Sequence, residues 1–179
     1  MKKAPLLMAS LVLAIILLGA TGCDNINPAN GSADNTPQES DFNFIFKYGV
    51  TAKNELDTFK GKFTKDMVSD PPITVKLSLT EEEKNSIYQK MVEIDFFDYP
   101  DRFSVSVPPG ELTGMVTPYL TYYFKVAYDS QVKELWWDDE ITNPDQRADK
   151  LRELISLVRN IVESKEEYKK LPEPRSGYL

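Results

Sequence analysis

The chain contains no histidine and only one cysteine, Cys23, among its 179 residues. Without histidine it cannot form a Ser-His-Asp triad, a Cys-His nucleophile pair or an imidazole-ligated zinc or iron site. With one cysteine it cannot form an internal disulfide, so its stability must come from a packed core. A hydrophobic fraction of 41% is sufficient for such a core.

The sequence also lacks a cluster of glycines, and it has fewer basic than acidic residues. Gly49, Gly61, Gly110 and Gly114 are isolated, so they form no glycine-rich phosphate loop. Lys and Arg number 21 against 28 Asp and Glu, which gives a net charge of -7. Phosphate backbones repel an acidic protein, so we do not expect a nucleic-acid partner. Catalysis by paired carboxylates stays open, as does a Ser-Lys dyad, although no spacing favours a particular pair.

The apolar run at the start of the chain is too short to span a membrane, since a spanning helix needs about 20 residues. Residues 6–18 form an uncharged run of 13 residues after the basic start Met1-Lys2-Lys3. These proportions are typical of an export signal. The next residues, Gly19-Ala20-Thr21-Gly22-Cys23, resemble the lipobox of bacterial lipoproteins. In that family small residues precede an invariant cysteine, and Ala20 stands where leucine is preferred.

The resemblance implies that the Cys23 sulfur receives a diacylglyceryl group and that residues 1–22 are removed as a signal peptide. Two acyl chains on one residue hold a protein stably at a membrane. We therefore expect a lipid-anchored protein on the extracytoplasmic face of the cell membrane. Loss of Lys2 and Lys3 leaves 19 basic against 28 acidic residues, a net charge of -9. The alternatives are an uncleaved membrane helix over residues 4–21 and a secretory signal with an incidental cysteine.

Residues 23–41 are predicted to comprise the lipidated Cys23 and a flexible tether. The segment is rich in Asn, Asp, Ser, Pro and Gly, and it holds one large apolar residue, Ile26. Such a segment cannot bury enough surface to offset its ordering entropy. A random-coil chain of this length reaches roughly 20–25 Å, so the tether is expected to keep the following domain near the membrane.

Residues 42–171 are predicted to form a single α+β domain, followed by a polar tail over residues 172–179. Several segments alternate between apolar and polar residues, the period of a half-buried strand, or are rich in β-branched and aromatic residues. Strands are predicted over residues 42–48, 56–64, 73–79, 103–107, 119–128 and 131–137. Gly61 is expected to mark a bulge, Pro71-Pro72 to bound the third strand, and Asp129-Ser130 to turn the last hairpin.

Two helices complete the predicted fold. Thr80-Glu81-Glu82-Glu83 matches a capping box and predicts a helix that ends near Phe96. Asn143-Pro144 predicts a second helix with an Asn cap and proline at its first position. The order is roughly βββαβββα, which fits a mostly antiparallel sheet of five or six strands with both helices packed on one face.

Two acidic clusters are candidate sites with simpler structural explanations. Trp136-Trp137-Asp138-Asp139-Glu140 places aromatic planes beside carboxylates, an arrangement that can bind sugars or a cation. A core tryptophan, a surface tryptophan and a solvated turn before a helix explain the same residues more simply. Closely spaced acids that could hold calcium occur at Glu93, Asp95, Asp98 and Asp101. They lack a D-x-D-x-D-G loop, and a helix end explains them more simply.

The third candidate is the loop over residues 108–118 with the tyrosine-rich segment after it. A loop rich in Pro and Gly beside aromatic residues is typical of a partner-binding edge. We predict such an edge from Tyr119, Tyr122, Tyr123 and Trp137. Packing within a half-buried strand is the alternative explanation of these aromatics.

The domain is similar to small uncharacterised lipoprotein domains of Gram-positive bacteria, a resemblance that brings neither an activity nor site residues. We predict a non-catalytic, lipid-anchored module that binds a protein, a peptide or a cell-wall component, with no metal and no cofactor. One alternative is a carboxylate-based hydrolase of wall glycan that uses acids such as Asp138 or Glu140. The other is a calcium-dependent module.

Overall fold

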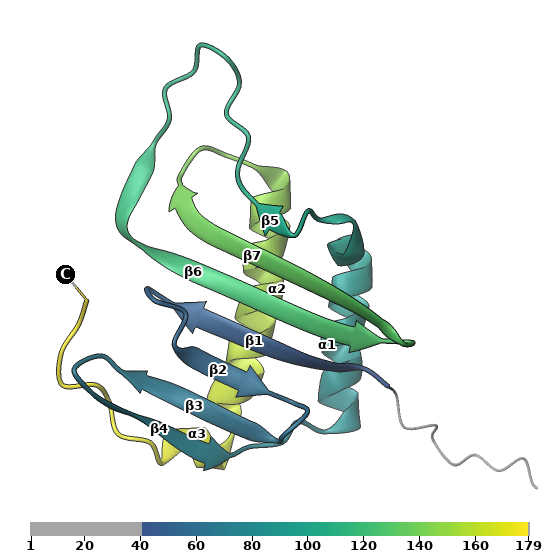
Figure 1. Cartoon of the computed structure of the whole chain (residues 1–179), viewed down its shortest axis with the longest axis vertical. Helices are drawn as coiled ribbons and strands as arrows, with labels where there is room; N and C mark the ends of the chain where they lie inside the picture. Colours follow the sequence, from purple (N-terminus) through teal and green to yellow (C-terminus); the bar gives the residue numbers. More distant parts are fainter. Residues whose placement is uncertain (1–40, 179) are drawn as a thin grey trace, which may run out of the picture. The chain divides into compact units, whose positions relative to one another are not determined.

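Alternating apolar and polar residues produce the central strand of the fold. In the computed structural model, which describes residues 41–178, β1 (Asn43–Gly49) buries Phe44, Phe46 and Tyr48. β1 pairs with β2 and β6 within a seven-stranded sheet ordered β4-β3-β2-β1-β6-β7-β5 (Figure 1). The predicted signal peptide, Cys23 and residues 24–40 of the predicted tether lie outside the described residues.

The segment expected to form one strand over residues 56–64 is a hairpin. β2 (Asn54–Asp57) and β3 (Lys62–Met67) pair antiparallel, and residues 58–61 turn between them. Gly61 has a φ of 57°, the left-handed region that glycine adopts readily, so it closes a turn and does not make a bulge. An Asp57 carboxylate oxygen accepts a hydrogen bond from the Lys60 amide at 3.2 Å and holds the turn. The described sheet therefore has one strand more than the order predicted.

The two edges of the sheet are short or proline-containing strands. β4 (Asp70–Lys76) pairs with β3 and includes Pro71-Pro72, which an edge strand tolerates because its outward N–H groups need no partner. At the other edge, β5 (Arg102–Phe103) runs parallel to β7, while every other described pair is antiparallel. The predicted α+β class and mostly antiparallel sheet are thus confirmed.

A long hairpin of β6 (Met115–Tyr128) and β7 (Gln131–Ile141) supplies the next two strands. Asp129 and Ser130 turn it as predicted, and both adopt positive φ, as a two-residue hairpin turn requires. Both strands are longer than expected. Residues 115–118 belong to β6, and residues 138–141 continue β7 where an acidic turn was predicted.

Two helices, α1 (Glu81–Glu93) and α2 (Gln146–Ser164), cover one face of the sheet (Figure 1). α1 begins at the predicted capping box, in which Thr80 Oγ1 accepts from the Glu83 amide and a Glu83 carboxylate oxygen accepts from the Thr80 amide. α1 ends at Glu93, earlier than expected, and a 3-10 turn, η1 (Phe96–Asp98), follows it. Within the described part of the chain, none of the helices has the length and apolar content to cross a bilayer.

The start of α2 differs from the prediction. Asp145 is the N-cap, because its carboxylate accepts a hydrogen bond from the Ala148 amide at 2.9 Å. The predicted cap, Asn143, instead binds the preceding loop. Its side-chain oxygen accepts from the Gly114 amide at 2.8 Å, and its side-chain nitrogen donates to the Leu112 carbonyl at 3.0 Å.

After α2 the chain returns to the first hairpins. A short helix, α3 (Glu166–Lys169), is followed by a polar tail that contacts β3. Lys65 Nζ donates to Glu173 at 3.0 Å, and the Tyr178 hydroxyl donates to an Asp66 carboxylate oxygen at 2.6 Å. These contacts hold the tail against the sheet.

Replacing Asp145 with alanine should lower the free energy of unfolding by about 1 kcal/mol, because the first turn of α2 loses its cap. In amide hydrogen exchange, Ala148 should lose protection in Asp145→Ala while Gly114 keeps it. Asn143→Ala is the matched control, in which Gly114 should lose protection and Ala148 should keep it. Loss of Ala148 protection in Asn143→Ala alone would contradict this assignment.

Candidate functional site

The structure places the four residues of the predicted partner-binding edge on both faces of the sheet. Tyr122 and Trp137 face the helices, where they are 5% and 1% exposed and their ring centroids lie 5.5 Å apart. Burial, with a smaller contribution from the Asp139 charge, raises the pKa of Tyr122. Tyr123 lies on the opposite face beside Trp136, at a centroid distance of 5.9 Å, and Tyr119 is half-buried. Two of the four residues are therefore part of the core.

The loop before these tyrosines exposes a different set of apolar residues. We call Leu112, Met115, Val116 and Leu120 the apolar tip; their side chains are 93%, 66%, 43% and 40% exposed, respectively. Between Arg102 and Lys125 the sequence contains no basic residue and one acid, Glu111. Because 27% of the whole chain is charged, the apolar tip is a nearly uncharged stretch on a polar surface. Exposed apolar residues concentrated in one segment of a polar surface are typical of interaction sites.

The apolar tip includes main chain that is free to pair. The ladder between β1 and β6 ends at Gly49 and Thr121, so residues 115–120 have no strand beside them on that side within the described structure. On the other side β7 pairs with Leu120 and with Met115, but the register is irregular between these two residues. Unpaired N–H and C=O groups at a sheet edge accept an added strand, and here Pro118 contributes a carbonyl but no N–H.

Several contacts fix the loop that carries the apolar tip. Besides the two hydrogen bonds of Asn143, the Thr142 amide donates to the Gly114 carbonyl at 2.9 Å. A Cβ atom on Gly114 would lie too close to the Thr142 side-chain oxygen, so another residue here would force the Thr142 side chain to move. The exposed leucine is thus held by a loop that is tied to the start of α2, which reduces the ordering cost of binding.

Two of the three acids of the predicted tryptophan cluster, Asp138 and Asp139, are engaged in structural contacts, whereas Glu140 forms no hydrogen bond or ion pair within residues 41–178. Asp138 accepts hydrogen bonds from the Thr121 hydroxyl at 2.6 Å and from Trp136 Nε1 at 3.2 Å. Asp139 accepts two hydrogen bonds from Arg152, at 2.6 and 3.1 Å. Successive residues of a strand point to opposite faces, so Asp138 and Asp139 lie on opposite faces of β7. Paired-carboxylate catalysis requires two carboxylates that converge on one site, and this pair does not.

The acids around η1 do not gather either. Glu93 pairs with Lys90 at 2.9 Å, and Asp101 pairs with Lys133 of β7. Over residues 41–178 no group of three or more acids converges as ligands of a metal ion. The geometry therefore gives the calcium alternative no support.

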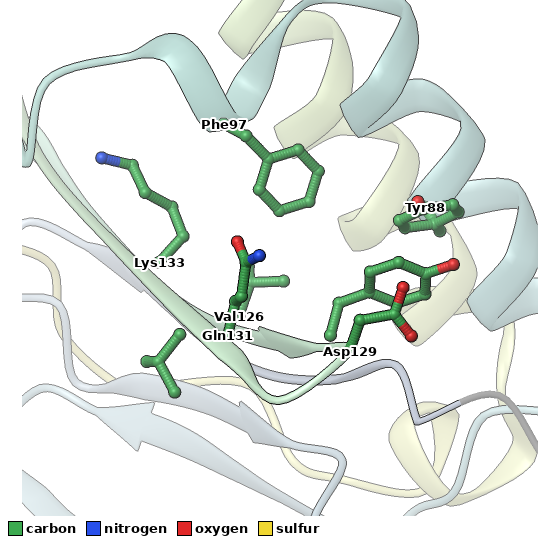
Figure 2. Close-up of a pocket in the computed structure, with 8 residues that line it drawn as sticks. Tyr88, Phe97, Val126, Asp129, Gln131 and Lys133 are labelled. Carbon is green, nitrogen blue, oxygen red and sulfur yellow. The ribbon is translucent and has the colours of Figure 1, made fainter.

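A groove that the sequence did not indicate opens at the far end of the β6–β7 hairpin (Figure 2). It has a volume of about 360 Å³, and its lining comes from α1, η1 and both strands of the hairpin. Val126, Tyr128, Gln131 and Lys133 belong to the strands, whereas Tyr88 and Phe97 come from the helical layer. Asp129 of the hairpin turn lies at one end and Lys133 at the other (Figure 2).

The tyrosines of the groove form a stacked pair. The rings of Tyr88 and Tyr128 lie 4.4 Å apart at an interplanar angle of 27°. A hydrogen bond with Tyr128, burial and the negative charge of Asp129 raise the pKa of Tyr88 to about 12, so its hydroxyl is neutral at physiological pH. Tyr88 and Asp129 are 41 positions apart in the sequence, and no local pattern links them. Only the folded hairpin brings them together.

Neighbouring tyrosines of β6 should differ sharply in their contribution to stability. Tyr122→Ala is expected to lower the free energy of unfolding by about 3 kcal/mol, because it leaves a cavity beside Trp137. Tyr123→Ala, on the open face, should cost about 1 kcal/mol or less. Urea denaturation of both variants measures this difference. Equal losses would contradict the assignment of Tyr122 to the core.

Comparison with known proteins adds no function by similarity. No protein-family model matches the chain, and no curated protein matches it. The functional conclusion therefore depends on the apolar tip and the groove themselves.

Proposed function

We propose that this protein is an exported, lipid-anchored lipoprotein whose domain is a non-catalytic binding module. Its ligand is an extended segment of another protein, which adds as a strand along the free edge of β6 at the apolar tip. The observation that carries this proposal is the combination of four exposed apolar side chains with unpaired main chain over residues 115–120.

The size of the apolar tip favours a single extended segment over a second globular surface. Four side chains with these exposures present on the order of 400 Å² of apolar surface in total. A standard protein interface takes about 800 Å² from each partner. An added strand makes up the difference with main-chain hydrogen bonds, while alternate side chains contact the apolar residues.

The direction of the strands places the apolar tip far from the start of the domain. Asn43, at the start of β1, pairs with Ala127 near the end of β6. Met115 lies 12 residues earlier along the same strand, which corresponds to roughly 40 Å. If the chain is anchored through Cys23, β1 begins at the end of the sheet opposite the apolar tip.

Photo-crosslinking in cells tests the apolar tip as the binding surface. A photoreactive phenylalanine analogue at Val116 should crosslink to one partner, through residues of an extended segment, because Val116 lies on the free edge. Val92 of α1 is the matched control, since it is a valine of similar exposure, 48% against 43%. Adding Leu112→Asp should abolish the Val116 product without loss of stability. Identical products from Val92 and Val116, or none from Val116, would contradict the proposal.

The proposed anchor has its own test, which is independent of the apolar tip. Mass spectrometry of the protein from native membranes should find Cys23 as the first residue, carrying a diacylglyceryl group. In Cys23→Ser the chain should keep residues 1–22, because lipidation precedes cleavage in the lipoprotein family. An intact Met1 or an unmodified Cys23 in the unaltered protein would exclude the anchor.

A further inference from the structure

We propose that the groove at the hairpin end of β6 and β7 binds the ammonium group of a lysine side chain from a peptide or protein ligand (Figure 2). The groove and the apolar tip lie at opposite ends of β6, because Tyr128 ends the strand that Met115 begins. The inference therefore stands whether or not the apolar tip binds a partner.

The groove has a free negative charge at one end. Asp129 is exposed, and within residues 41–178 its carboxylate takes part in no hydrogen bond and no ion pair. The positive φ of Asp129, 47°, results from its place in the hairpin turn, which fixes the carboxylate beside the groove. A bound cation would form an ion pair with this carboxylate.

The remaining lining suits the rest of a lysine side chain. Phe97, which is 38% exposed, offers apolar surface to its four-carbon stem. The stacked rings of Tyr88 and Tyr128 lie beside Asp129, and aromatic faces attract cations. An ammonium group has three donors and no acceptor. The Asp129 carboxylate, the Gln131 side-chain oxygen and a tyrosine hydroxyl are acceptors that together match it.

The one cation in the lining does not oppose this assignment. Lys133 lies at the end of the groove opposite Asp129, and its ammonium group is paired with Asp101 (Figure 2). Its charge is therefore compensated by a residue that does not line the groove. The net charge of the chain, -7, further favours the approach of a basic ligand.

Nuclear magnetic resonance of the full chain in detergent micelles tests this proposal with a defined probe. N-acetyl-lysine methylamide should shift the signals of Val126, Tyr128 and Gln131, with a dissociation constant on the order of millimolar, as expected for one side chain. Its uncharged counterpart, N-acetyl-norleucine methylamide, should bind at least about tenfold more weakly. Equal binding of the two probes, or no shift with either, would overturn the proposal.

Two variants separate the groove from the general acidity of the protein. Asp129→Asn should weaken binding of the lysine probe about tenfold, and it should fold normally because asparagine tolerates positive φ. Asp70→Asn removes the same charge from β4, at the far edge of the sheet, and should leave binding unchanged. Equal weakening by the two variants would overturn the assignment of the site. Leu112→Asp should leave probe binding intact, so failure of the proposed apolar-tip function would not be confused with failure of this one.

Discussion

One-sided burial of a single sheet is the constraint on which the rest of this structure depends. α1 and α2 cover the face that carries Phe44, Phe46 and Trp137, and these side chains are almost completely buried. β6 has 14 residues and β7 has 11, whereas β1 has seven. At about 3.3 Å per residue, β6 is far longer than the strand beside it. The excess lies at the start of β6, because at the hairpin end β1 reaches Ala127, one residue before β6 ends.

The apolar tip arises from this excess length, whereas the groove forms where the hairpin turn meets the helical layer. At the start of β6 the neighbouring strand β1 has already ended, which leaves free main chain and the apolar tip. At the hairpin turn the strands face Tyr88 and Phe97 of the helical layer across the groove. The two sites differ in chemistry, since the first is nearly uncharged and the second holds an unpaired carboxylate. A module with such ends can contact two different features of its surroundings.

The sequence predicted those elements whose pattern is local. The capping box at Thr80, the alternation of β1 and the Asp129-Ser130 turn all appear where expected, because each depends on residues within a few positions. The sequence misplaced features that tertiary contacts decide. In the sequence, the glycine at position 61 is equally consistent with a bulge and with a turn. Asn143 has the sequence context of a helix cap, but in the folded chain its side chain binds the loop at Gly114 instead.

The candidate sites were less predictable than the fold for the same reason. The sequence predicts the tyrosine-rich strand correctly, but alternation alone does not say which face the helices cover. The predicted partner-binding edge therefore combines Tyr122 and Trp137, which are buried, with Tyr123 on the opposite face. The exposure of Leu112 and Met115 depends on where β1 ends. The groove is lined by Tyr88 and by a turn 41 positions away in the sequence, and no sequence pattern predicts that they lie together.

Residue-level amide hydrogen exchange along β6 in the full chain tests the central claim most directly. If β6 extends beyond β1, the amides of Val116, Thr117 and Tyr119 exchange orders of magnitude faster than those of residues 122–127, which lie between two strands. The boundary should fall close to Thr121, where the β1 ladder ends. Uniform protection from Met115 to Tyr128 would show that β6 is paired along its whole length, and neither the free edge nor the strand-addition site would exist.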